Sequence, residues 1–240
     1  MNVTKARENY RVIPHGGPRT LVLTHLRGGQ SHNTRVCRKL WEVADPVFPN
    51  RSPFDHRLYL KENHTDFLEQ VELRLGQDDK VFSASGSLHD RTPPTGYENS
   101  THIFVPASER GFVGPGRHLF FLGGGNLKFC LADTFESIIL AKGEQGERVQ
   151  IVITTPLAYT AKAMDRSGYV KNPNEFSKIL EGRDHRIAVD GELIADESGK
   201  NPVVELHWFS SVTTMFASPF FPELQDTTAF SRVINYFMHI

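Results

Sequence analysis

The fold class predicted for this chain rests on the stretch His118-Leu-Phe-Phe-Leu-Gly-Gly-Gly-Asn-Leu-Lys-Phe-Cys130. An apolar run of strand length meets three glycines, and Asn126 then occupies the position of a helix cap. An amphipathic pattern continues without a breaker to Lys142, and the apolar residues of 148–154 are typical of a second buried strand. Strand, helical crossover and strand in this order predict a βαβ unit with two parallel strands.

The same arrangement occurs near the start of the chain. Thr20-Leu-Val-Leu-Thr-His-Leu26 is typical of a buried strand, Arg27-Gly-Gly-Gln-Ser31 of a turn, and the residues from His32 to Pro46 of an amphipathic helix. Apolar segments and helical periodicity predict further strands at 57–60, 80–85, 101–106 and 203–209, and further helices at 65–75, 174–180 and 228–239.

An Asp-Gly pair between alternating apolar residues predicts an antiparallel hairpin near 186–195. The alternation of strands and helices elsewhere predicts a Rossmann-like α/β fold of three layers. Its sheet is open and mostly parallel, with helices on both faces and the hairpin inserted. A chain of 240 residues with 39% hydrophobic content is long enough for one sizeable core, and we expect a single domain over residues 1–240.

Composition and charge argue against several classes of partner. The 27 basic and 28 acidic residues nearly balance, so no polybasic face for nucleic acid is indicated. The longest apolar runs are too short to span a bilayer, and no secretory signal is recognisable, so we expect a soluble cytoplasmic protein with no membrane partner. Two cysteines, Cys37 and Cys130, give no disulfide framework. Whether the chain forms homo-oligomers stays open.

The sequence contains none of the common short motifs for cofactors and metals. Neither the P-loop spacing nor the dinucleotide pattern Gly-x-Gly-x-x-Gly fits the glycine run. The eleven histidines form no His-Glu-x-x-His pattern, and no Cys-x-x-Cys pair is present. We therefore predict no cofactor and no local metal site, although a metal held by residues far apart in the sequence stays open.

The glycine run itself predicts a ligand site. Gly123, Gly124 and Gly125 let backbone amides approach a ligand, and the helix that follows presents unpaired N–H groups with partial positive charge. A phosphate, a carboxylate or a developing oxyanion fits such a turn. The alternative is a turn that needs glycine only for its backbone angles. Both interpretations stay open on the sequence alone.

Cys130 comes in the first turn of the predicted helix, where the helix dipole lowers the pKa of a thiol and makes it a better nucleophile. Lys128 adds positive charge nearby. A free cysteine is also a common core residue, and Leu131 and Phe135 share its apolar surroundings. Cys130 is therefore a candidate nucleophile, although a lone cysteine more often serves packing than chemistry.

Over residues 118–156 the sequence resembles the nucleophile segment of the isochorismatase-like cysteine hydrolases. The resemblance rests on a strand, a glycine turn, and a cysteine that opens a helix before a buried strand. It implies a three-layer parallel-sheet fold and Cys130 as nucleophile, paired in that family with an aspartate on the first strand and an intervening lysine. Here the first strand carries Thr24-His25-Leu26 in place of the aspartate, and no matching lysine is found.

His25 and Arg27 lie at the carboxyl end of the first predicted strand, at the edge where ligands bind in parallel sheets. An imidazole titrates near neutral pH, and a guanidinium grips a carboxylate or phosphate at two points. Together with Gly28 and Gly29 they predict a second wall of the same site, although each is also explained as an ordinary loop or core residue.

Three functions are compatible with this pattern. The first is hydrolysis of amides or related carbonyl compounds, with Cys130 as nucleophile, His25 as general base, and the amides of Gly124, Gly125 and Asn126 as oxyanion donors. The second is a module that binds an anionic small molecule at the turn Gly123 to Asn126 without covalent chemistry. The third is an interaction protein in which the glycines are purely structural.

Overall fold

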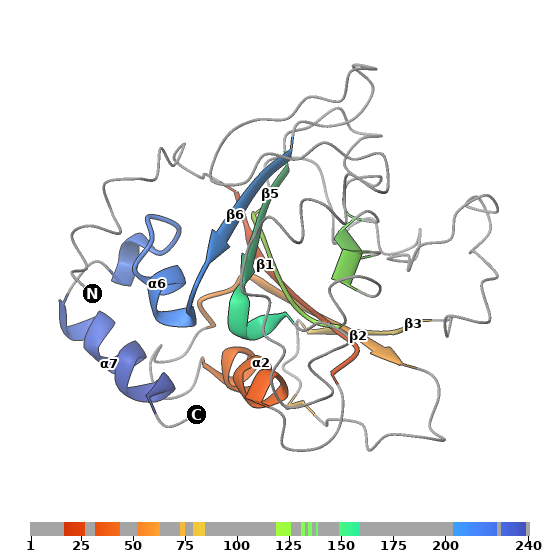
Figure 1. Cartoon of the computed structure of the whole chain (residues 1–240), viewed down its shortest axis with the longest axis horizontal. Helices are drawn as coiled ribbons and strands as arrows, with labels where there is room; N and C mark the ends of the chain where they lie inside the picture. The colour runs from red at the N-terminus through yellow and green to blue at the C-terminus, as the bar shows by residue number, and fades with distance from the viewer. Residues whose placement is uncertain are drawn as a thin grey trace.

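A computed structural model describes twelve stretches of the chain, including single residues, and they build one parallel sheet. The stretches are 17–26, 32–43, 52–62, 73–74, 79–84, 119–125, 131–132, 134–135, 138, 149–158, 204–224 and 227–238. The strands are β1 (Arg19–Thr24), β2 (His56–Glu62), β3 (Lys80–Ala84), β4 (Leu119–Gly124), β5 (Val149–Thr154) and β6 (Val204–Phe209). They follow the order β3-β2-β1-β4-β5-β6, and every neighbouring pair is parallel (Figure 1).

The predicted fold class is confirmed. The chain moves outward from β1 to β3, returns to the other side of β1, and moves outward again from β4 to β6, so the strand order reverses between β1 and β4. The βαβ unit predicted over 118–154 pairs β4 with β5 in parallel. The predicted hairpin near 186–195, the strand at 101–106 and the helix at 174–180 lie outside the described residues.

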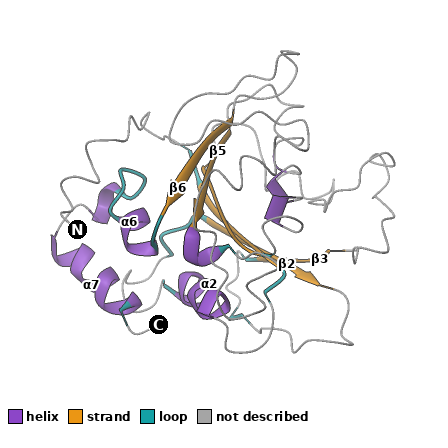
Figure 2. Ribbon diagram, viewed as in Figure 1, coloured by secondary structure: helices purple, strands orange, loops and turns teal. Residues whose placement is uncertain are grey.

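One layer of helices covers the first face of the sheet. It contains α2 (His32–Glu42), α6 (Val212–Phe216), α7 (Thr227–Phe237) and the short 3-10 turns η2 (Thr155–Leu157) and η4 (Pro222–Leu224). Side chains alternate between the faces of a strand, so Leu21 and Leu23 point to this layer. They pack with the buried residues Cys37, Leu40, Trp41, Phe121, Val152, Phe216 and Phe221. Figure 2 shows α2, α6 and α7 together on this side of the sheet.

The opposite face is covered by helical residues from the segment that follows the glycine run. Leu131, Ala132, Phe135 and Ile138 are all buried, with the spacing of one helical stripe. Thr134 from the same stripe lies with its Oγ1 atom 3.0 Å from the Oγ1 atom of Thr24. Helical residues therefore cover both faces, as the three-layer prediction requires.

The aromatic segment after β6 belongs to the core rather than to a surface loop. Ser211 caps α6 in a capping box: its side chain accepts from the backbone N–H of Thr214, and the Thr214 hydroxyl accepts from the backbone N–H of Ser211. Phe216, Phe220 and Phe221 are buried against the first face of the sheet. A helix of five residues is too short for its periodicity to predict it, and α6 is absent from the sequence-based assignment for that reason.

Arg19 fastens this segment to the start of β1. Its Nη1 atom donates to the Phe220 carbonyl oxygen at 3.2 Å and to the Glu223 Oε1 atom at 2.5 Å. Its guanidinium carbon also lies 5.0 Å from the centroid of the Phe221 ring. The contacts join residues about two hundred positions apart in the sequence and hold the segment after α6 against the amino end of β1.

The structure differs from one predicted helix at its carboxyl end. The helix predicted at 65–75 does not extend over Leu73 and Arg74, which are described and are not helical. The Arg74 carbonyl oxygen instead accepts from the Trp41 indole N–H at 2.8 Å, a contact outside any helical ladder.

In the described stretches, no helix has the length and apolar character needed to cross a bilayer.

Candidate functional site

The candidate site lies at the carboxyl edge of the sheet, between the ends of β1 and β4. The two strands are in register to their last residues, with Thr24 opposite Gly124. The chain continues from β1 to α2 on one face of the sheet, and from β4 to the helical residues Leu131 and Ala132 on the other face. Ligands of open parallel sheets bind at such a reversal of strand order. The turn predicted at 27–31 comes after β1, whereas the glycine run begins inside β4, whose last two residues are Gly123 and Gly124.

The backbone at this edge is left-handed on both strands. His25 has φ 42°, Gly124 has φ 73° and Gly125 has φ 60°. Glycine adopts these angles without penalty, whereas a side chain with a Cβ atom is strained there. His25 is the one described residue other than glycine with a positive φ. Its backbone N–H donates to the Leu60 carbonyl oxygen at 2.8 Å, which holds the turn against β2.

Packing excludes a side chain at Gly124 and disfavours one at Gly123. A Cβ atom on Gly124 would lie 2.2 Å from the Thr24 carbonyl oxygen, so the ends of β1 and β4 approach closely only because residue 124 has no side chain. A Cβ atom on Gly123 would lie 3.0 Å from Leu157 Cβ and 3.2 Å from Leu23 Cδ2. The glycine run therefore has a structural cause at 123 and 124, independent of any ligand.

Cys37 lies beneath the glycine run, a role that its position in the middle of a helix does not reveal in the sequence. It is fully buried on α2, and its thiol donates to the Leu157 carbonyl oxygen at a sulfur-to-oxygen distance of 3.9 Å. Burial raises the pKa of Cys37 to about 12, and the backbone N–H of Gly124 opposes this rise by a smaller amount. Because that N–H faces the Cys37 sulfur, the oxyanion role predicted for Gly124 competes with a contact in the core.

The sequence predicts that Cys37 is buried on a helix, but it does not predict which residues Cys37 contacts. Helical spacing groups Cys37 with Leu40 and Trp41 on the buried side of α2. Its neighbours across the interface, Gly123 and Leu157, come from β4 and η2. No local pattern predicts a contact across so long a separation, so this part of the site needed the tertiary structure.

The first turn of α2 is fastened to the loop after β5. The Asn33 side-chain amide donates to the Pro156 carbonyl oxygen at 3.1 Å, and both residues belong to elements that begin at the carboxyl edge. The ends of β1, β4 and β5 are thus joined through α2 and η2. A hydrogen bond of this kind fixes the start of α2 at the carboxyl edge of the sheet.

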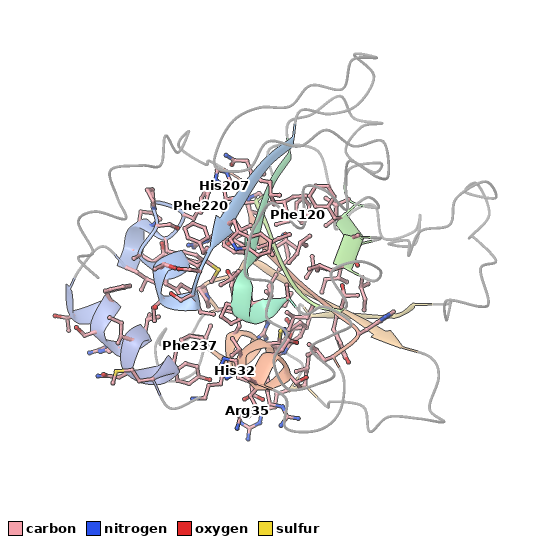
Figure 3. All side chains as sticks on the ribbon, viewed as in Figure 1. His32, Arg35, Phe120, His207, Phe220 and Phe237 are labelled. Atoms are coloured by element: carbon pink, nitrogen blue, oxygen red, sulfur yellow. The ribbon has the colours of Figure 1, made fainter. Side chains whose placement is uncertain are left out.

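The outer side of α2 is basic near its start. The first turn of the helix contains no acidic residue, and Arg35 and Arg38 are exposed. Partial burial, and secondly the positive charge of Arg35, lower the pKa of His32 from its ordinary value. Figure 3 shows Arg35 projecting from α2 away from the sheet. The exposed charges add to the positive potential that a helix start carries, which favours an anion at this edge.

The predicted site residues fall into two groups. His25, Gly123, Gly124 and Gly125 are described and lie together at the ends of β1 and β4. The remaining predicted residues are outside the described stretches and stay predictions: Arg27, Gly28, Gly29, Asn126 and Cys130. Within the described part of the chain, no group of three or more His, Cys, Asp or Glu side chains is placed to hold a metal ion.

Comparison of the chain with protein-family models, with curated proteins and with solved structures finds no match. The function is therefore inferred from the geometry of this edge of the sheet.

Proposed function

We propose that the protein binds an anionic small molecule in the crevice between the ends of β1 and β4. The observation that carries the proposal is the coincidence of two features at one place. The strand order reverses there, and three left-handed residues, His25, Gly124 and Gly125, turn the chain away from both strand ends. A backbone turned in this way lets amide groups face a ligand rather than the ladder.

The charge near the crevice supports an anion rather than a cation. Arg35 and Arg38 are exposed on α2, and Arg27 precedes that helix in the sequence. Such a site selects a phosphate or carboxylate by its charge and leaves the rest of the ligand to apolar walls. Gly125 and Asn126 supply the backbone amides in this proposal, since the Gly124 N–H faces Cys37.

Thermal denaturation with defined anions tests the proposal. Orthophosphate, AMP and succinate are added in turn, and the melting temperature is followed with increasing concentration. A ligand at one hundred times its dissociation constant stabilises the folded state by about 2.7 kcal/mol, which is a shift well above the error of the method. An Arg35→Glu variant is expected to lose much of the shift, because it reverses an exposed charge near the start of α2, the helix that begins at this edge of the sheet.

A charge-matched control separates this effect from the net charge of the protein. Arg232 is exposed on α7, so Arg232→Glu makes the same change of charge on a helix other than α2. It is expected to keep the anion-induced shift. Equal shifts in the Arg35→Glu and Arg232→Glu variants, or no shift for any of the three anions with the wild-type protein, would refute the proposal.

A second candidate function, hydrolysis of amide-like compounds, is favoured by one contact. The Thr134 Oγ1 atom lies 3.0 Å from Thr24 Oγ1, next to His25 in the sequence, and the helix predicted from the sequence would carry Cys130 one turn before Thr134. In this proposal His25 accepts the Cys130 proton, and the sulfur attacks the carbonyl carbon. The carbon–nitrogen bond breaks and the amine leaves with the proton from His25. Water then cleaves the thioester, which releases the acid and restores the thiol.

Alkylation of the native protein by iodoacetamide tests the second candidate. Cys37 is fully buried with a pKa near 12, so it is expected to stay unmodified while the protein is folded. One alkylated site at pH 7, mapped to Cys130 by mass spectrometry, therefore reports on that residue alone. A rate that rises through a pKa well below 8.5 supports a nucleophile, and a native protein in which neither cysteine reacts excludes one.

A further inference from the structure

The outer face of α2 carries a local excess of positive charge. The residues of this helix that are not buried are His32, Arg35, Arg38, Lys39 and Glu42. Arg35 and Arg38 are exposed, and neither forms an ion pair within the described part of the chain. Figure 3 shows Arg35 projecting from α2 away from the sheet. Basic and acidic residues nearly balance over the whole chain, 27 against 28, so the excess belongs to this helix and not to the composition.

The order of the charges along α2 does not favour the helix itself. Acidic side chains stabilise the start of a helix and basic side chains its end. The first turn of α2 has no acidic residue and contains Arg35, whereas the acidic Glu42 is the last residue. Arg35 and Arg38 are three positions apart, so two like charges are neighbours on the helix surface. The stability of the helix therefore does not account for the two arginines.

Lys39 shows how a cation on this face looks when its role is structural. Its Nζ atom donates to the Tyr236 carbonyl oxygen at 2.8 Å and lies 5.1 Å from the centroid of the Tyr236 ring. Tyr236 is in the last turn of α7, where free carbonyl groups attract a cation. Lys39 thus fastens α7 to α2. Arg35 and Arg38 make no such contact with the described residues, so their charges are available to a partner that approaches from outside.

We propose that the outer face of α2 docks an acidic segment of a partner protein, with Arg35 and Arg38 each binding one carboxylate. The planar guanidinium group matches a carboxylate with two parallel hydrogen bonds. The Cβ atoms of residues three positions apart on a helix are about 5–6 Å apart. Carboxylates two positions apart in an extended segment have nearly the same separation, about 6.6 Å. A nucleic acid fits less well, because its phosphates follow one another without a gap and would also meet Glu42.

Fluorescence anisotropy with a labelled peptide tests the proposal. The probe is a rhodamine-labelled peptide of alternating glutamate and alanine, ten residues long, and the same peptide with glutamine in place of glutamate is its control. The wild type is expected to bind only the glutamate peptide and to release it in high salt. Arg35→Glu and Arg38→Glu should each weaken binding about tenfold, since an attraction becomes a repulsion. Arg232→Glu makes the same change of charge on α7 and should keep the wild-type affinity.

Three results would overturn the proposal. The first is no binding of the glutamate peptide by the wild type. The second is an equal loss in the Arg38→Glu and Arg232→Glu variants, because binding would then follow only the net charge. The third is tighter binding of a ten-nucleotide oligothymidylate with the same dependence on Arg35 and Arg38, which would assign the surface to nucleic acid.

A stability measurement separates docking from a role in the fold. Arg35→Gln removes a cation from the first turn of α2 and should raise the melting temperature by about 1–2 °C. Arg232→Gln lies outside the first and last turns of α7 and should leave the melting temperature unchanged. A melting temperature of Arg35→Gln below that of the wild type would overturn the proposal, since Arg35 would then serve the fold.

Discussion

Replacing Gly124 by alanine tests the packing of the site most directly. The new Cβ atom would lie 2.2 Å from the Thr24 carbonyl oxygen and 3.0 Å from Leu26 Cδ2. A left-handed angle costs a residue with a Cβ atom about 1–2 kcal/mol, and residue 124 has φ 73°. Forcing an extra methyl group into packed surroundings costs about 1–3 kcal/mol more. We expect Gly124→Ala to lower the free energy of unfolding by about 3 kcal/mol or more.

The neighbouring glycine is a matched control. Gly123→Ala adds the same methyl group 3.0 Å from Leu157 Cβ, in a strand conformation without a positive φ. Only the overpacking cost applies, so the expected loss is about 1–2 kcal/mol. Urea denaturation followed by fluorescence of the buried Trp41 measures both variants. For a chain of this length, a loss of 3 kcal/mol corresponds to a melting temperature lower by about 6–12 °C.

The comparison between the two variants is decisive. A Gly124→Ala protein as stable as Gly123→Ala would refute the close approach of β1 and β4 on which the site is built. A loss of stability in both variants with the order reversed would have the same meaning, because the left-handed angle and the contact with a backbone oxygen occur only at residue 124.

Three further outcomes are expected. The pKa of Cys37 rises from 9.0 to about 12 on folding, so between these pH values only the unfolded state loses the thiol proton, and the free energy of unfolding should fall by about 1.4 kcal/mol per pH unit. Cys37→Ala should remove this part of the pH dependence in urea denaturation measured from pH 8 to 11. An unchanged dependence of the unfolding free energy on pH in the variant would contradict this expectation. Arg57 binds Asp79 through two hydrogen bonds of 2.6 and 2.7 Å, so Arg57→Lys should lower the free energy of unfolding in urea by about 2 kcal/mol. An Arg57→Lys protein as stable as the wild type would show that the planar guanidinium group is not needed here. Glu223→Gln removes only the charge of the pair with Arg19, which is partly exposed, and should cost about 1 kcal/mol or less in melting experiments, with the small loss disappearing in 1 M salt.

Several elements could be predicted from short patterns alone. The strands β1, β4, β5 and β6 are runs of apolar and β-branched residues, and the structure confirms each of them. Burial on both faces of a central parallel strand produces such continuous apolar runs. The helix α2 was predictable for a related reason, because its buried residues repeat at the spacing of one helical face.

The order of the strands was not available from any such pattern. Nothing local in the sequence states that β4 pairs with β1 rather than with β3, which precedes it in the chain. The general rule for parallel sheets predicted that both glycine turns share one edge, and the observed pairing of β1 with β4 places their strand ends side by side. Short elements were also missed, since α6 has only five residues.

In the candidate site, too, the sequence predicted which residues lie there but not what they contact. His25 and the three glycines were identified by their position after two strands, because glycine after an apolar run is a local signal. The reason for two of the glycines was not local, since the atoms that exclude a side chain belong to Thr24, Leu23 and Leu157. The burial of Cys37 beneath the run and the left-handed angle of His25 were equally invisible in the sequence.

The glycine run thus shows what the sequence by itself determined and what required the folded chain. Hydrophobic periodicity and turn residues act over a few positions, so the sequence alone determined the α/β class, most of the described strands and the location of a turn rich in glycine. Packing joins residues more than one hundred positions apart, so only the tertiary structure decided that Gly124 lies against Thr24 and that His25 is strained between β2 and β4. A contact between distant segments depends on the path of the whole chain, and no short stretch of sequence contains it.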